Sequence, residues 1–226
     1  MIRVATLALL LVSSLALAGG AQDTSDVARL DPRTRIAVQR VLDSTRALGL
    51  PTMPLEWKVA EGLTKGADGA RILSAVQRSA DGLRRARTSL GSTSTTAELV
   101  AGGNALQAGI SAEVLRRLRA SQPGRSVTTR LVVLSDLVSR GVPEPDASGV
   151  VSELSAAGAS DADFGALRRE VITDLEKGAT PASAVRSRAR ELGARIPSRQ
   201  GGVRILRDTT RPAMTPSTSP PEVPST

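Results

Sequence analysis

The chain has 226 residues and a formal net charge of +8, with no His, Cys or Tyr, one Trp and one Phe. Without His or Cys, a His-containing catalytic triad, a thiol nucleophile and an ordinary zinc or copper site are excluded. The core must therefore consist of Leu, Val, Ile and Ala. Only three of the 30 basic residues are lysines, and the codon bias of a high-GC genome explains this excess of Arg better than selection for guanidinium chemistry.

Residues 1–21 have the pattern of a secretory signal peptide. Arg3 provides the positive charge, residues 4–17 form an apolar segment, and small residues suited to cleavage follow. We expect cleavage after Ala21, with Ala18 as the second choice. An uncleaved membrane anchor is the alternative, but the apolar segment is short for a spanning helix, and no later segment is apolar enough to span. We therefore expect an exported protein, periplasmic or extracellular, with no membrane span after signal cleavage.

Residues 22–193 are predicted to form a helical domain in which six helix boundaries share one pattern. A glycine ends one helix in the left-handed conformation, the next residue packs back on that helix, and a capping residue or proline begins another helix. The six glycines are Gly49, Gly66, Gly109, Gly141, Gly158 and Gly178. Six copies in one chain indicate consecutive helical hairpins. Gly193 is expected to end the last helix in the same way.

The first two helices of this domain carry apolar stripes. Asp31 and Pro32 begin the first helix, whose expected stripe is Ala37, Val41, Thr45 and Leu48. The second helix has two stripes on different sides, one of Leu55, Val59 and Leu63 and one of Met53, Trp57 and Ala60. We favour the packing of this helix between neighbours. The functional alternative is a groove or contact surface centred on Trp57, because aromatic residues anchor interfaces.

The later segments are also helical, and none has the alternation of a β-strand. Thr95 or Thr96 caps one of these helices, in which Gly102 and Gly103 predict a kink or a close helix contact. Phe164 lies on an ordinary core stripe.

Residues 49–87 and 141–177 are predicted to be related units at an offset of 92 residues. Both begin with a Gly-apolar-Pro sequence, at Gly49 and Gly141, and both reach their next hinge glycine after the same number of residues. The alternative is that any two capped hairpins of equal length look alike in an Ala- and Gly-rich chain. Residues 194–226 are rich in Pro, Ser, Thr and Arg and are predicted to form a disordered tail.

The sequence contains no phosphate-binding loop and no dinucleotide fingerprint, and we predict no catalytic, cofactor-binding or metal-binding residues. Three pairs of carboxylates are close enough in sequence to consider for acid–base chemistry: Glu56 with Glu61, Glu144 with Asp146, and Asp161 with Asp163. Helix capping and solvation explain these pairs better. A calcium site at the last pair would need more oxygen ligands than the turn offers.

Arginine pairs on single helix faces are the other candidate contact surface: Arg84 with Arg87, and Arg186 with Arg190. Such faces can hold polyanions or anionic lipid headgroups, although a solvated basic face is the simpler explanation. Nucleic acid is disfavoured as a partner because the chain is expected to be exported and has no aromatic residues interleaved among its basic ones.

Residues 49–87 and 131–161 resemble uncharacterised exported helical hairpin proteins of high-GC bacteria, and the resemblance brings no activity or site residues with it. We expect an all-α protein of about nine short helices stacked as hairpins, in a bundle or short α-solenoid. Our functional hypothesis is a non-catalytic binding or scaffolding protein of the cell envelope, whose partner is an envelope protein or an anionic polymer or lipid surface. The candidate interaction residues are Met53, Trp57, Arg84, Arg87, Arg186 and Arg190. The alternatives are a carboxylate-dependent hydrolase and a peripheral binder of anionic membranes.

Overall fold

The computed structural model describes residues 23–196, so the predicted signal peptide and nearly all of the predicted tail lie outside the described residues. The described residues are all-α and contain ten helices: α1 (Asp23–Ala28), α2 (Pro32–Ala47), α3 (Met53–Thr64), α4 (Gly69–Leu90), α5 (Thr96–Gln107), α6 (Ala112–Ser121), α7 (Thr128–Ser139), α8 (Glu144–Ala156), α9 (Asp161–Glu176) and α10 (Pro181–Arg195). None of these helices has both the length and the hydrophobicity needed to cross a membrane.

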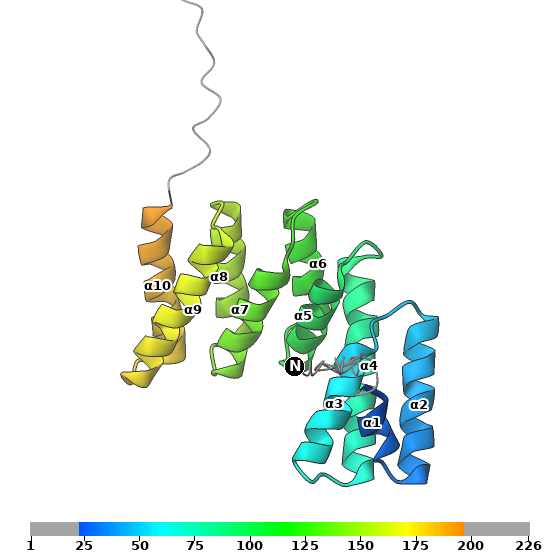
Figure 1. Cartoon of the computed structure of the whole chain (residues 1–226). Helices are drawn as coiled ribbons and strands as arrows, with labels where there is room; N and C mark the ends of the chain where they lie inside the picture. Colours follow the sequence, from blue (N-terminus) through cyan, green and yellow to red (C-terminus); the bar gives the residue numbers. More distant parts are fainter. Residues whose placement is uncertain (1–22, 197–226) are drawn as a thin grey trace, which may run out of the picture.

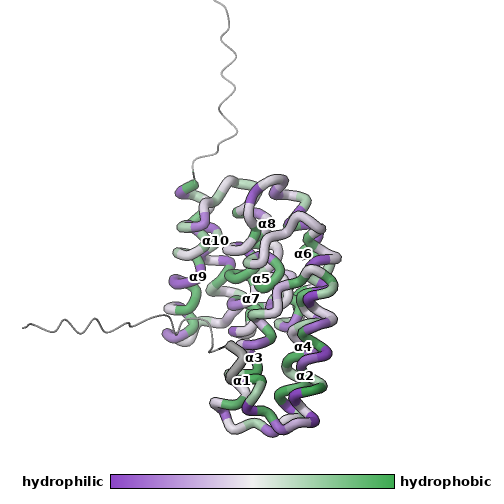
Figure 2. The backbone as a smooth tube through the Cα atoms, turned by 45° about the vertical axis from the view of Figure 1, so that its right-hand side comes forward, coloured by the Kyte–Doolittle hydropathy of each residue, from purple (hydrophilic) through white to green (hydrophobic). Residues whose placement is uncertain are grey.

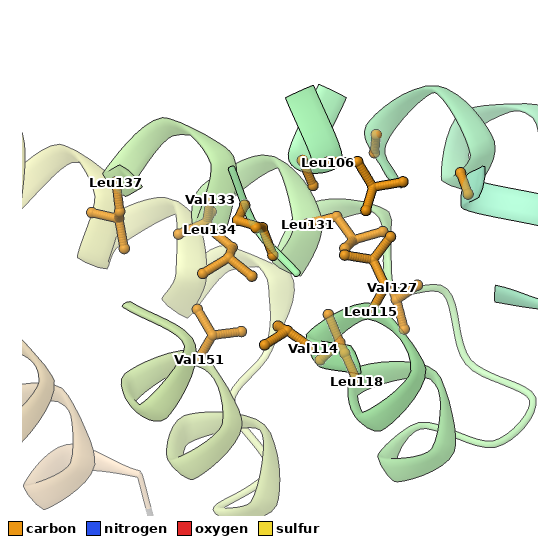
Figure 3. Close-up of a cluster of buried hydrophobic side chains, with 14 of the residues drawn as sticks. Leu106, Val114, Leu115, Leu118, Val127, Leu131, Val133, Leu134, Leu137 and Val151 are labelled. Atoms are coloured by element: carbon orange, nitrogen blue, oxygen red, sulfur yellow. The ribbon is translucent and has the colours of Figure 1, made fainter. Parts of the chain in front are cut away.

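The helices stack as hairpins in a row, which confirms the predicted all-α architecture as a short solenoid (Figure 1). Helices α5, α7 and α9 pack side by side in one layer, and α4, α6, α8 and α10 do so in the other. Hydrophobic and hydrophilic residues alternate along the helices (Figure 2), as expected for helices with one buried face. Figure 3 shows side chains of α6, α7 and α8, among them Val114, Leu134 and Val151, gathered in one buried cluster.

The predicted hinges are confirmed. All six hinge glycines have a positive φ, between 64° and 95°. At each hinge the next residue donates its N–H to the carbonyl five residues earlier, as Leu50 does to Thr45 at 3.1 Å. This is the Schellman arrangement, which satisfies the last carbonyls of a helix. The stop predicted at Gly193 is wrong, because α10 continues to Arg195. Ala194 and Arg195, which follow Gly193, are good helix formers and extend the helix.

Two features at the beginning of the domain differ from expectation. Helix α1 was not predicted, because six residues are too few to show an apolar stripe. The buried stripe of α2 is Val38, Leu42 and Thr45, whereas Leu48 is 57% exposed. Helix α2 contacts both α1 and α4, so its buried sector is rotated from the expected one.

The hairpins from α5 onward recur about every 32 residues, since α5 begins at Thr96, α7 at Thr128 and α9 at Asp161. The units predicted at an offset of 92 cover different positions in this series. Residues 49–87 cover α3 and most of α4, and residues 141–177 cover α8 and α9. A common origin of the two units stays a prediction.

Helix α4 is the longest helix and holds different partners along its length. Near its start, Ile72 lies so close to α3 that a Cβ on Gly62 would be 2.6 Å from it. Further along, Gly82 faces Gly103 of α5, and a Cβ on Gly103 would lie 3.2 Å from the carbonyl carbon of Gly82. The predicted close helix contact at Gly102 and Gly103 is therefore confirmed.

We expect Gly103→Ala to destabilise the protein by about 1–3 kcal/mol, because overpacking at a backbone contact exceeds the gain in helix propensity. Gly149→Ala in α8 is the matched control, since a Cβ there meets nothing within 4 Å. That variant should be about 0.5–1 kcal/mol more stable than wild type. Chemical denaturation measures both changes, and equal stabilisation of the two variants would contradict the close contact.

The buried side chain of Glu98, which is only 3% exposed, connects α5, α6 and the backbone just before α7. It completes a capping box with Thr95 at the start of α5. Its carboxylate also accepts a hydrogen bond from Arg119 of α6 at 2.5 Å and from the N–H of Val127, just before α7, at 3.0 Å. Burial alone would raise the pKa of Glu98, but the N–H groups of Thr95 and Val127 and the Arg119 guanidinium hold that pKa below its usual value.

Arg130 performs the equivalent task one hairpin later. It is 2% exposed and is the third residue of α7, as Glu98 is of α5. Its guanidinium pairs with Asp161 at 2.9 Å, donates to the carbonyl of Ala159 at 3.2 Å and lies 5.0 Å from the ring centroid of Phe164. Arg130 therefore fastens α7 to the hinge between α8 and α9. Neither buried charge was predicted from the sequence.

We expect Glu98→Gln to lower the free energy of unfolding by about 3 kcal/mol at pH 7, because it breaks a buried charged network. Since folding lowers the pKa of Glu98, its contribution is present above the unfolded pKa and is lost as the pH falls through the folded value. The difference between wild type and variant should therefore shrink below about pH 4.5. Denaturant titrations from pH 7 to pH 3 measure it. The control is Glu113→Gln, which breaks an exposed pair with Arg116 and should stay within about 0.5 kcal/mol of wild type at pH 7.

Candidate binding groove

Helix α3 presents three different faces. Leu55 and Val59 are fully buried and Leu63 is half-buried against the core, so the first predicted stripe is confirmed. Met53 and Trp57 on the second stripe are 49% and 60% exposed. The interpretation that this stripe packs between neighbours is therefore wrong. Helix α3 is covered by α4 on one side, and the only other helix that packs extensively on it among the described residues is the short α1.

A groove with a volume of about 710 Å³ lies along α2, between α1 and the first turn of α3. Its apolar lining includes Val27 of α1 and Ile36 and Leu42 of α2. A smaller hollow of about 60 Å³ adjoins it, and Met53 and Trp57 line that hollow. The two share Val27 and Glu56, so they adjoin each other and Trp57 lies beside the larger one; together we call them the N-terminal groove.

In the described residues, α1 is shorter than α2 and α3, the helices it packs on. Helices α2 and α3 both pack on α4, and α1 contacts both of them. With six and 16 residues, α1 and α2 are about 9 Å and 24 Å long. The described part of α1 therefore covers less than half of the length of α2.

The α2 wall of the groove is basic. Arg35, Arg40 and Arg46 line it together with Asp43, and Glu56 lines it from α3. Asp43 is already engaged, because Arg46 contacts it at 2.8 Å and the Gln39 amide donates to it at 3.0 Å. The wall therefore keeps an excess of positive charge.

The six candidate residues do not converge on one site. Met53 and Trp57 line the N-terminal groove, whereas the arginines lie on α4 and α10. Arg84 pairs with Asp81, and Arg87 donates to the carbonyl of Ser92. At the other end of the row, Arg186 pairs with Asp146 at 3.1 Å, and Arg190 donates to the carbonyl of Arg186. The two arginine pairs are thus separate from each other and from the groove.

The three carboxylate pairs are also dispersed. Glu56 and Glu61 line different cavities. Glu144 lines another cavity, whereas Asp146 pairs with Arg186 of α10. Asp163 caps α9, where hydrogen bonds from the Ser160 hydroxyl and N–H lower its pKa, while its neighbour Asp161 pairs with Arg130. Within residues 23–196, no group of three or more His, Cys, Asp or Glu side chains is placed to hold a metal ion. The groove residues Arg40 and Asp43 were missed by the sequence analysis, because α1 was not predicted.

Comparisons with protein families, with known proteins and with solved structures find no match for this chain. The function is therefore inferred from the geometry and chemistry of the groove.

We expect acrylamide to quench the emission of Trp57 almost as efficiently in the native protein as in the denatured chain, because the indole is mostly exposed. The chain has a single Trp, so the emission reports on this position alone. The exposed position is contradicted if acrylamide quenches the native emission only weakly, both at micromolar protein concentration and at a tenfold lower one. Protection that is lost on dilution would instead show that a second copy covers it.

Proposed function

We propose that this protein is a non-catalytic binding or scaffolding protein of the cell envelope, which holds a helix of a partner protein in the N-terminal groove. The observation that carries the proposal is the 60% exposure of Trp57 beside an apolar groove of about 710 Å³. Aromatic residues at the margin of an apolar cleft are typical anchors of protein interfaces. Export depends on the signal peptide predicted in residues 1–21, which lies outside the described residues.

The length of the groove suits a short helix. The groove is lined by α2 from Arg35 to Arg46, a length of about 16 Å, and about eleven helical residues span this length. An amphipathic helix that lies in an apolar groove places residues at spacings of three and four against the groove floor. Ile36 and Leu42 supply that floor, and Trp57 lies at its edge.

The charges of the groove select among such helices. Three arginines of the α2 wall, Arg40 among them, face the occupant of the larger hollow, where Asp43 and Glu56 oppose them. Asp26 lines the adjoining hollow, where it pairs with Arg29. Complementary charge along an interface favours the matching partner and accelerates encounter. We therefore expect a partner helix with an acidic flank beside its apolar face.

Binding fits the described side chains better than hydrolysis does. A carboxylate-dependent hydrolase needs two carboxyl groups that face one substrate bond. The pairs considered from the sequence are dispersed, and Asp43 in the groove is held by Arg46 and Gln39.

Photocrosslinking from the groove tests this proposal. Gln39 is replaced by benzoylphenylalanine in the full-length protein expressed in its own host, and the adducts are identified by mass spectrometry. We expect a protein adduct that Ile36→Glu abolishes and Arg40→Glu weakens, because these changes disrupt the apolar floor and the basic wall. The crosslinked peptide should be an amphipathic helix with acidic residues on its flank.

Two matched variants serve as controls. Val132→Glu changes a β-branched residue of similar exposure on α7, and Arg186→Glu reverses one charge on α10. Neither should reduce the adduct. A groove that forms no adduct, or an adduct lost equally in the control variants, would refute the proposal.

A further inference from the structure

A second hollow, of about 260 Å³, lies on the other side of α3. Lys58 and Glu61 of α3, Ile72 and Ala75 of α4, and Gln107 at the end of α5 are among its lining residues. Helices α3 and α5 pack on different parts of α4, and the hollow lies between the second half of α3 and the last residue of α5. We call it the lysine pocket. It shares no lining residue with the N-terminal groove.

The lysine pocket has a strong excess of positive charge. Four cations line it, namely Lys58, Lys65, Arg71 and Arg78, and Glu61 is its only carboxylate. Lys58 and Lys65 contact the two oxygens of Glu61 at 2.7 Å and 2.5 Å. These hydrogen bonds, first that of Lys58, lower the pKa of Glu61 to about 2. Glu61 is therefore ionised at neutral pH and balances one of the two lysines.

The two arginines add to this excess. Arg71 has an exposed partner outside the lining, Asp68, at 3.3 Å. Arg78 donates to the neutral hydroxyl of Ser74 at 2.6 Å, and no carboxylate within residues 23–196 pairs with it. The amide of Gln107 donates to the carbonyl of Arg78 at 3.5 Å and closes the end of the pocket. The positive side chains thus surround a half-buried apolar floor that includes Ala67 and Ala75.

The presence of lysine in this pocket needs its own explanation. The chain has only three lysines among 30 basic residues, and two of them line this one cavity. The codon bias that we infer from the excess of Arg does not account for the placement of Lys58 and Lys65 in one cavity. An ammonium group is a compact point charge that binds phosphate oxygens without the planar geometry a guanidinium requires.

We propose that the lysine pocket binds the phosphate group of an organic phosphate whose apolar part rests on the alanines of the floor. Lys58, Lys65 and Arg78 contact the phosphate oxygens, and Glu61 opposes the ligand and limits its affinity. The phosphate belongs either to a small soluble ester or to a lipid headgroup. This binding is independent of the helix proposed for the N-terminal groove.

Calorimetry with 1-naphthyl phosphate tests the proposal, with 1-naphthol and inorganic phosphate as partial ligands. We expect the ester to bind more tightly than either partial ligand. The double variant Lys58→Gln/Lys65→Gln should bind the ester at least about tenfold more weakly. Glu61→Gln should bind it at least about threefold more tightly, because one opposing charge is removed. A parallel arm measures co-sedimentation with phosphatidylcholine vesicles that contain phosphatidylglycerol.

The control is Arg186→Gln/Arg190→Gln, which removes the same net charge from α10. If the soluble ester binds and only the pocket variants change its affinity, the result supports the site with a soluble ligand. Vesicle binding alone, changed only by the pocket variants, supports it with a lipid headgroup. Absence of both, or an equal loss in the control variant, overturns the proposal, because the surface charge as a whole would then explain any binding. Circular dichroism confirms that each variant is folded.

Discussion

Two buried charged side chains, Glu98 and Arg130, fasten successive hairpins of this solenoid to one another. Each is the third residue of its helix, and each reaches a backbone group 29 residues later, the N–H of Val127 or the carbonyl of Ala159. In a helical repeat protein, each repeat contacts only its neighbouring repeats, so the register of each hairpin must be set locally. Faces of Ala, Leu and Val can pack in more than one register, whereas a directional bond to one backbone group fixes a single register. The rest of the row depends on this constraint, because an error at one hairpin would displace every later one.

The long helix α4 is the second determinant of the shape. It packs α2 and α3 as well as α5 and α6, so it joins the first helices to the regular hairpins. The contact between Gly82 and Gly103 lets α4 and α5 approach closely in the middle of the row. One consequence is that, among the described residues, only α1 and α4 pack extensively on α3. The N-terminal groove and the lysine pocket are the two openings that result, on either side of the same helix.

The features that follow from local chemistry were predictable from the sequence. The hinge glycines and the Thr95 cap depend on residues a few positions apart, and the structure confirms them. The close contact at Gly102 and Gly103 was predictable from the two adjacent glycines, although its partner Gly82 lies on α4. The exposure of Trp57 was not predictable, because its stripe looks the same whether or not a neighbouring helix covers it. Arg130 was missed for a similar reason, since its partner Asp161 is 31 residues away. The candidate groove was not predictable, because it depends on the extent of α1 in the described residues and on which helices pack on α4.

The faces of α3 carry different chemistry, and this separation has a functional consequence. Leu55 and Val59 hold the helix on the core, Met53 and Trp57 line the groove, and Lys58 and Lys65 line the pocket. The only other aromatic residue, Phe164, is buried beneath Arg130, so Trp57 is the one large apolar ring available to a partner in the described residues. Because the groove and the pocket share a helix but no residues, an occupant of one does not displace an occupant of the other. The two binding sites that we propose are therefore separate openings beside one helix, which is the arrangement that our proposal of a scaffolding protein requires.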